Sequence, residues 1–332
     1  MKNLKFLLIP KSNNFKDIIN IKEISNELIK RGYLCITLLS PVNDKNLEFI
    51  LKNEKFDFVI RINKGKPENV KKRARFISWI NEISDVEETL NNFNENDLIY
   101  TLKQSNTQNK KIKINQMLPA ANTFKNVLTI SDYKSIINNK NFQDIDISLI
   151  VNHTRAELFN GNKEIVLKVK TLNTKKSEYF HKIINELDKD YITQVHNFFD
   201  YSQVWKNDRI KYKGEINNFN YFFEIFRNSK FNVLFEDEYL EFRTNFFNIL
   251  LVEGTLLLNS KLLHQINKYL KLEEDSSNYF FKYSDIESFK FYISNYYDNF
   301  NKRLQVGKKA SSLIRKKHLY KNRVDQILKD LN

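Results

Sequence analysis

Short apolar runs alternate with segments of helical spacing at the start of the chain. Runs that are apolar at nearly every position are typical of strands buried on both faces of a parallel sheet. The apolar runs are Leu4–Ile9, Leu34–Leu39 and Phe56–Ile62. The segments of helical spacing are Asp17–Arg31, closed by Gly32, and Asn43–Asn53. This order predicts a β-α-β-α-β series whose sheet is covered by helices.

The same pattern continues along the rest of the chain. Phe76–Ile80 and Leu98–Leu102 predict further short strands, and a lysine-rich segment, Lys103–Lys113, separates the latter from Ile114–Leu118. A second unit begins at Asp144–Val151. Its expected strands are Glu164–Thr171, Ile192–His196, Phe231–Phe235 and Thr255–Asn259. Its expected helices are Ser177–Leu187, Asn245–Val252 and most of Asp285–Leu331, with the aromatic stretch Tyr279–Tyr297 as helix packing surface.

Two consecutive units of this kind predict an α/β protein with two Rossmann-like, doubly wound domains facing a cleft. Ligands of such sheets bind at the carboxyl ends of the strands. We expect an N-terminal domain over residues 1–140, a C-terminal domain over 141–310, and a final helix over 311–332 that packs back on the N-terminal domain. The linker is expected near Ile130–Gln143. The architecture alone suits dehydrogenases, binding proteins and transferases, so the function has to come from the site residues.

Several functional motifs are absent from the sequence. The first strand is followed by IPKSNNF and not by G-x-G-x-x-G, and neither a P-loop nor a G-x-S-x-G elbow occurs. The five histidines are scattered without an H-E-x-x-H pattern, and the single cysteine, Cys35, can form no intramolecular disulfide. Asp144-Ile145-Asp146 matches a D-x-D metal motif, but it starts a strand, and we interpret it as a solvated strand entry. We therefore expect no metal and no cofactor.

The net charge of +14 comes mostly from lysine. One explanation is the amino-acid bias of an AT-rich genome, since Lys, Asn, Ile and Phe are all abundant. The other is an anionic partner, namely a nucleotide diphosphate, an acidic membrane surface or nucleic acid. The cluster Lys71–Arg75 is either a solvated face or a surface that steers an anionic acceptor or lipid headgroup. We expect a cytoplasmic protein, with peripheral contact at the inner membrane face as an alternative, because no apolar run is long enough to cross a bilayer.

The segment Glu241–Asn259 carries the strongest candidate chemistry. It predicts a loop, a short helix capped by Thr244 or Asn245, and a buried strand after Gly254. Arg243 stands just before the helix, whose free backbone N–H groups and dipole favour an anion. A diphosphate there would meet oriented amides and a guanidinium able to bind it through two hydrogen bonds.

This order of features resembles the donor site of GT-B glycosyltransferases, and is most similar to the spore-maturation CgeB-like group of the glycosyl transferases group 1 type. The family pattern is a Glu, a second Glu after seven residues, and a glycine before a strand. The resemblance implies that Glu241 contacts the donor sugar and that Gly254 and Thr255–Asn259 are the glycine and the strand. The second acid falls on Ile249, and Glu253 lies about one helical turn away from that position.

Three further stretches agree with the resemblance. Asp146–Val151 resembles the first strand of the nucleotide-binding half, with Asn152-His153 in place of the usual glycine. Phe222–Phe235 resembles the short helix and strand that precede the donor loop in the family. Lys317–Leu328 resembles the closing helix of the family, and it matches at His318, Tyr320, Arg323, Ile327 and Leu328. The resemblance covers the chain from Asp144 to the C-terminus, whereas the N-terminal half agrees in architecture alone.

The resemblance implies a metal-independent glycosyltransferase that moves a sugar from a nucleotide-diphosphate donor to a glycan, lipid-linked glycan, protein or nucleic acid. The expected donor-binding residues are Glu241, Arg243, Thr244, Asn245, Glu253, Gly254 and Thr255. Further candidates are His318, Arg323 and Trp79, for which a helix surface or core position is the alternative. No residue is assigned as the catalytic base. Two other functions stay open: a basic protein that binds nucleic acid or glycosylates it, and a catalytically degenerate family member.

Overall fold

The computed structural model divides the chain into two compact units. One contains Met1–Asn126, Glu241–Thr244 and Lys316–Asn332, and the other contains Val127–Leu240 and Asn245–Arg315. The description covers residues 4–13, 15–62, 65–70, 74–80, 92–101, 114–123, 127–136, 142–151, 163–197, 202–216, 218–234, 244–262, 266, 270, 272 and 275–331. The last stretch of the chain thus belongs to the same unit as the first, whereas the main division falls at residues 126 and 127.

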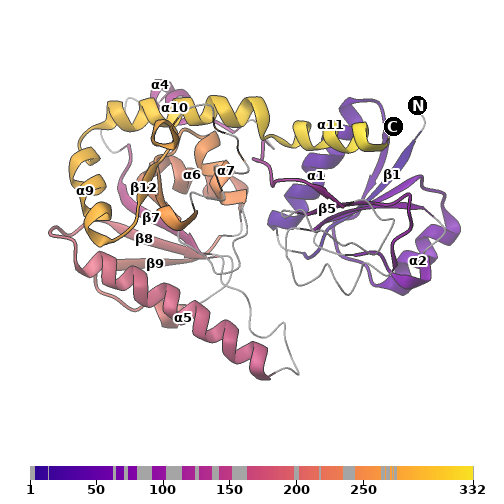
Figure 1. The fold of residues 1–332 in the computed structure, drawn as a ribbon, viewed down its shortest axis with the longest axis horizontal. Coiled ribbons are helices and arrows are strands. Elements are labelled where there is room, and N and C mark those ends of the chain that lie inside the picture. Colours follow the sequence, from indigo (N-terminus) through magenta and orange to yellow (C-terminus); the bar gives the residue numbers. More distant parts are fainter. Residues whose placement is uncertain are drawn as a thin grey trace. The chain divides into compact units, whose positions relative to one another are not determined.

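The first unit is built on a six-stranded sheet of order β2-β1-β3-β4-β5-β6, and every pair of neighbouring strands is parallel. The strands are β1 Lys5–Ile9, β2 Leu34–Thr37, β3 Phe58–Ile62, β4 Arg75–Ile80, β5 Leu98–Thr101 and β6 Ile114–Gln116. The helices are α1 Phe15–Lys30, α2 Asp44–Asn53, the 3-10 turn η1 Glu68–Val70 and α11 Tyr320–Leu331. Figure 1 shows α1 and α11 next to each other beside this sheet.

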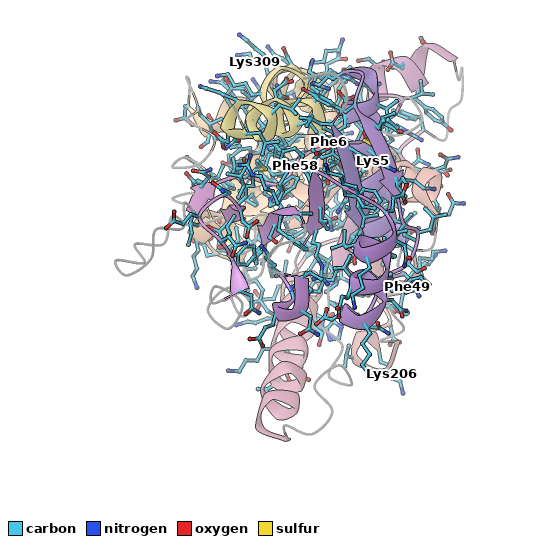
Figure 2. All side chains as sticks on the ribbon, turned by 90° about the vertical axis from the view of Figure 1, so that its right-hand side faces the viewer. Lys5, Phe6, Phe49, Phe58, Lys206 and Lys309 are labelled. Atoms are coloured by element: carbon cyan, nitrogen blue, oxygen red, sulfur yellow. The ribbon has the colours of Figure 1, made fainter. Side chains whose placement is uncertain are left out.

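The two faces of this sheet carry separate apolar cores. Side chains of α1 and α11 cover one face, where Phe6 and Phe58, both labelled in Figure 2, stack with ring centroids 4.9 Å apart. Side chains of α2 and η1, among them Leu47 and Val70, cover the other face. Burial on both faces explains why the strands are apolar at nearly every position.

The second unit is built on a six-stranded parallel sheet of order β12-β11-β10-β7-β8-β9. The strands are β7 Ile145–Val151, β8 Thr193–Asn197, β9 Ile210–Glu215, β10 Ser229–Leu234, β11 Leu256–Asn259 and β12 Phe281–Tyr283. The helices are α4 Ile130–Ile136, α5 Lys163–Asn185, α6 Phe219–Asn228, α7 Thr244–Leu251, α9 Ile286–Tyr296 and α10 Phe300–Lys317, with 3-10 turns η5 Ser202–Trp205, η6 Ser260–Leu262 and η7 Ser276–Asn278. One face packs on α5, η5 and α9, and the other on α6.

The structure confirms the expected α/β class with two doubly wound parallel sheets. The expected strand Glu164–Thr171 was wrong, because this segment is part of helix α5. Its alternating apolar and charged residues resemble a strand, but Lys, Glu and Leu also favour helices, and the helix continues unbroken to Asn185. Strands β9 and β12 were not expected, and β12 lies inside the aromatic stretch that was interpreted as helical.

Asp146 was expected to be solvated, and that expectation was wrong. Its side chain is buried at the start of β7. Its carboxylate accepts hydrogen bonds from Lys230 Nζ at 2.7 Å, from Tyr297 Oη at 2.8 Å and from the backbone N–H of Ile192 at 2.8 Å. The aspartate therefore joins β7, β10 and the helix α9 end at the amino edge of the sheet.

None of the described helices is both long enough and apolar enough to cross a bilayer.

Candidate functional site

The β10–α7–β11 connection of the second unit contains the described part of the candidate site. Helix α7 begins at Thr244, after the carboxyl end of β10, and returns the chain to the start of β11. The first backbone N–H groups of a helix have no partner within it, and its dipole places positive charge there. In a parallel sheet this edge is where ligands bind. The start of α7 is therefore suited to an anion.

Asn245 lies in the first turn of α7. Its side chain is 1% exposed, and its Oδ1 accepts no hydrogen bond from any residue in the described part of the chain. A buried polar atom without a partner costs about 1–3 kcal/mol, so such atoms are rare in native proteins and call for an explanation. A ligand at the start of α7 that donates a hydrogen bond would satisfy Asn245.

Glu241 and Arg243 lie outside the described residues, as does the whole segment 235–243 that contains them. Thr244 is described by its backbone as the first residue of α7. Arg243 still directly precedes the helix in sequence, so the proposed diphosphate contact of this arginine and the sugar contact of Glu241 stay predictions.

Glu253, Gly254 and Thr255 stand at the other end of α7, just before β11. Glu253 has a left-handed backbone with φ of 66°, and its Oε2 accepts a hydrogen bond of 2.8 Å from Ser131 N at the start of α4. A Cβ on Gly254 would lie 2.9 Å from the carbonyl oxygen of Ile249. The structure therefore gives these residues a packing and capping role and does not bring them together with Asn245.

Ile249, the position of the missing second acid, is fully buried in α7. A carboxylate at this buried position would lose its solvation. Neither Ile249 nor Glu253 supplies an acid at the start of α7.

His196 is a further polar residue at the carboxyl edge of this sheet, and no motif in the sequence selects it. It is the penultimate residue of β8, which pairs with β7, and it lies at a register irregularity between β8 and β9. The side chain is 0% exposed, and both ring nitrogens lack a hydrogen-bond partner among the described residues. Burial, followed by the charge of Lys213, lowers its pKa to about 4. The imidazole is therefore neutral at pH 7, and it can donate one hydrogen bond and accept another.

His318 and Arg323, the further candidates that match the closing helix of the family, belong to the first unit. Arg323 donates to the carbonyl oxygens of Leu118 at 2.7 Å and Pro119 at 2.8 Å, and to His318 Nδ1 at 3.0 Å. The backbone N–H of Ala121 donates to the carbonyl oxygen of His318 at 2.8 Å. These contacts bind the start of α11 to the segment after β6, so both residues have a structural role.

Trp79 is the remaining candidate, and it lies in the core of the first unit. Its ring is buried on β4 and meets Tyr320 edge-on at 5.9 Å between centroids. The alternative that it stacks on an acceptor sugar does not fit this burial. Its indole N–H donates no hydrogen bond to any described residue.

Among the described residues, no group of three or more His, Cys, Asp or Glu side chains could hold a metal ion. Lys71–Arg73, most of the basic cluster, lie outside the described residues, whereas Arg75 donates to the carbonyl oxygen of Asn96 at 2.7 Å.

Comparison with known proteins identifies the fold. No protein-family model matches the chain, and no curated protein matches its sequence. Among solved structures, sucrose-phosphate synthase from Thermosynechococcus elongatus matches with a TM-score of 0.64 at 10% identity, covering 98% of both chains. An alpha-glucosyltransferase in complex with UDP-glucose and DNA containing an abasic site matches with a TM-score of 0.63 at 10% identity, covering 100% of both chains. HepE from Anabaena, in complex with UDP and glucose, matches with a TM-score of 0.58 at 10% identity and 99% coverage of both chains.

The chain therefore has the GT-B fold, the two-domain α/β architecture of these glycosyltransferases, over its whole length. At this level of identity the likeness establishes the fold, and the activity has to be argued from the site.

Proposed function

We propose that the protein is a glycosyltransferase that uses a nucleotide-diphosphate sugar. The observation that carries this proposal is the match of the whole chain to glycosyltransferases whose structures contain UDP or UDP-glucose. The polar features of the second unit agree with it, since the start of α7 and His196 lie on one carboxyl edge of the sheet. The order of motifs in Glu241–Asn259 further supports a place near the CgeB-like group.

In this proposal the diphosphate binds at the start of α7. The backbone N–H groups of the helix and the guanidinium of Arg243 receive the negative charge that grows on the leaving diphosphate. Asn245 accepts a hydrogen bond from the donor, and Glu241 contacts its sugar. Since these groups are fixed dipoles and a cation, the reaction requires no metal ion for charge stabilisation.

Nucleotide binding tests the proposal directly. We expect the full chain to bind UDP or another nucleoside diphosphate in calorimetric titration, in buffer with EDTA, and to hydrolyse or transfer the sugar of the matching donor. Asn245→Ala should weaken this binding about three- to tenfold, since one hydrogen bond contributes about 0.5–1.5 kcal/mol. The matched control is Asn301→Ala, which changes an exposed asparagine in the first turn of another helix of the same unit. Absence of binding to every common nucleoside diphosphate would exclude the proposal.

A second candidate function is glycosyl transfer to nucleic acid. It is favoured by structural neighbours that are alpha-glucosyltransferases bound to DNA, and by the net charge of +14. If this candidate is correct, the protein binds duplex DNA with an affinity that falls steeply as salt increases, and it transfers sugar to the duplex. DNA binding without transfer would instead indicate the basic, non-catalytic alternative.

A further inference from the structure

Arg61 is a charged residue within an otherwise apolar strand of the first unit. It is the fourth residue of β3, whose sequence is FVIRI, and its side chain is 2% exposed. Its register partners are Ile9 on β1 and Ser78 on β4. Because side chains alternate along a strand, Arg61 and Ser78 share the face that Val59 and Phe76 occupy. Two neighbouring central strands thus place an arginine and a serine side by side near their carboxyl ends.

The guanidinium of Arg61 is incompletely satisfied. Its Nη1 donates to the carbonyl oxygen of Gly65 at 2.7 Å, whereas its Nη2 has no hydrogen-bond partner among the described residues. Burial lowers the pKa of Arg61 to about 10, although the negative charge of Asp44 acts in the opposite direction and raises it. The guanidinium therefore stays positive at pH 7. The Oγ of Ser78, 0% exposed, also lacks a partner within the described part of the chain.

Other buried cations of this unit differ from Arg61. Arg323 is used for structure, and its Nε, Nη1 and Nη2 all donate to backbone carbonyl oxygens. Lys66 is neutralised by a buried ion pair with Asp97 at 2.6 Å. The hydrogen bond from Arg61 to the carbonyl oxygen of Gly65 gives Nη1 a structural role. It gives no role to Nη2 or to the Ser78 hydroxyl. Buried charges are normally paired, so Nη2 and the Ser78 hydroxyl, which no described residue contacts by a hydrogen bond, are suited to binding an anion.

We propose that Arg61 and Ser78 bind an oxyanion, the phosphate or carboxylate of a small acceptor. The inference rests on the proposed function, because it assigns this group to the sugar acceptor held by the first unit. A guanidinium binds such a group through paired hydrogen bonds, and the serine hydroxyl donates a third. Both side chains are deeply buried, which suits a small terminal anion and not the backbone of a polymer.

The test is the binding of inorganic phosphate to the full chain, with UDP present at saturation so that the start of α7 is occupied. Binding is measured by phosphorus NMR and by the phosphate-dependent rise in Tm, at constant ionic strength. Arg61→Gln should weaken phosphate binding at least about tenfold, and Ser78→Ala about three- to tenfold. Lys55→Gln, which changes an exposed cation just before β3, is the control and should bind like wild type.

Ser78→Asp is a second variant that does not remove the arginine. Its carboxylate is in register with Arg61, so we expect a Tm no lower than that of wild type and no further rise with phosphate. Competition with glucose 6-phosphate and with glucuronate distinguishes a phosphate from a carboxylate acceptor, and Arg61→Gln should abolish the effect of whichever competes. The inference is overturned if Arg61→Gln and Ser78→Asp bind phosphate as wild type does. It is also overturned if duplex DNA competes with phosphate and neither glucose 6-phosphate nor glucuronate does.

The nucleotide result separates the two proposals. If wild type binds no nucleotide but phosphate binding depends on Arg61, the oxyanion site stands and the glycosyltransferase proposal fails. If nucleotide binds and phosphate binding does not depend on Arg61, the oxyanion site fails alone.

Discussion

At the scale of single residues, the candidates for ligand binding are polar groups that are buried without a hydrogen-bond partner among the described residues. His196, Asn245, Arg61 and Ser78 each have a buried polar atom that no described residue satisfies. Only Asn245 could be selected from the sequence, because it belongs to a recognisable helix start. Arg61 had one local signal, a charge inside an apolar run, but whether it is paired depends on neighbours far away in sequence. The candidate site was therefore predictable in its location and not in its full membership.

The buried histidine His196 makes stability depend on pH. Its pKa is about 4 in the folded state, against about 6.5 in an unfolded chain, so the unfolded state binds the extra proton first on acidification. The free energy of unfolding is therefore unaffected by His196 above pH 6.5. As the pH drops towards 4, protonation of His196 in the unfolded state lowers the free energy of unfolding by roughly 3 kcal/mol. Urea unfolding between pH 4 and 7 should show a weaker pH dependence for His196→Gln. Identical pH profiles would show that the pKa of His196 is the same in the folded and unfolded states.

Gly307 is a second residue for which the structure makes a sharp prediction. It lies in α10, where a Cβ would overlap the carbonyl oxygen of Glu253. Gly307→Ala should therefore destabilise the protein by about 1–3 kcal/mol, although alanine favours helices. The exposed Ser312→Ala on the same helix is the control and should change stability little. A stabilised Gly307→Ala variant in urea unfolding would contradict the close packing of α10 on Glu253.

At the scale of elements, strands were easier to predict than their surroundings. Continuous apolar runs identified most strands, because burial on both faces leaves few polar positions. The exceptions are informative, since β9, with sequence IKYKGE, carries lysines, and Glu164–Thr171 has the alternation of a strand but continues a helix. Local pattern does not decide between these outcomes, because the neighbours of each segment come from elsewhere in the chain.

The connection from α7 to β11 supports a prediction on Glu253. Its carboxylate caps α4 by accepting from Ser131 N, where the helix dipole favours a negative charge. Glu253→Ala should cost about 1 kcal/mol in urea unfolding, as loss of an N-cap does, and should leave nucleotide affinity unchanged. Weaker nucleotide binding with unchanged stability would restore Glu253 to the donor site, as the sequence first indicated.

At the scale of the whole molecule, the chain's last helix belongs to its first unit. The sequence pattern predicts a helix at the C-terminal end of the chain. Which unit this helix packs on depends on contacts with residues far away in sequence. Tyr320, Val324 and Ile327 lie in the core with α1 and β1. Arg31 on the end of α1 pairs with Asp325 at 2.6 Å, and Tyr100 donates to Asp330 at 2.9 Å. The first unit is therefore incomplete without α11, whereas the second unit has its own sheet and core.

Removal of α11 tests this division. A chain that ends at Lys317 loses three fully buried side chains from the core of the first unit, which costs about 5–9 kcal/mol at 1.5–3 kcal/mol each. That loss is comparable to the whole stability of a domain, so the first unit should unfold while the second stays folded. Calorimetry should show one thermal transition in place of two, and nucleotide binding at α7 should survive, since residues 245–251 of this helix, Asn245 among them, lie in the second unit. Lys321→Ala, an exposed change in α11, is the control and should retain both transitions. Simultaneous loss of both transitions would mean that the two units fold as one.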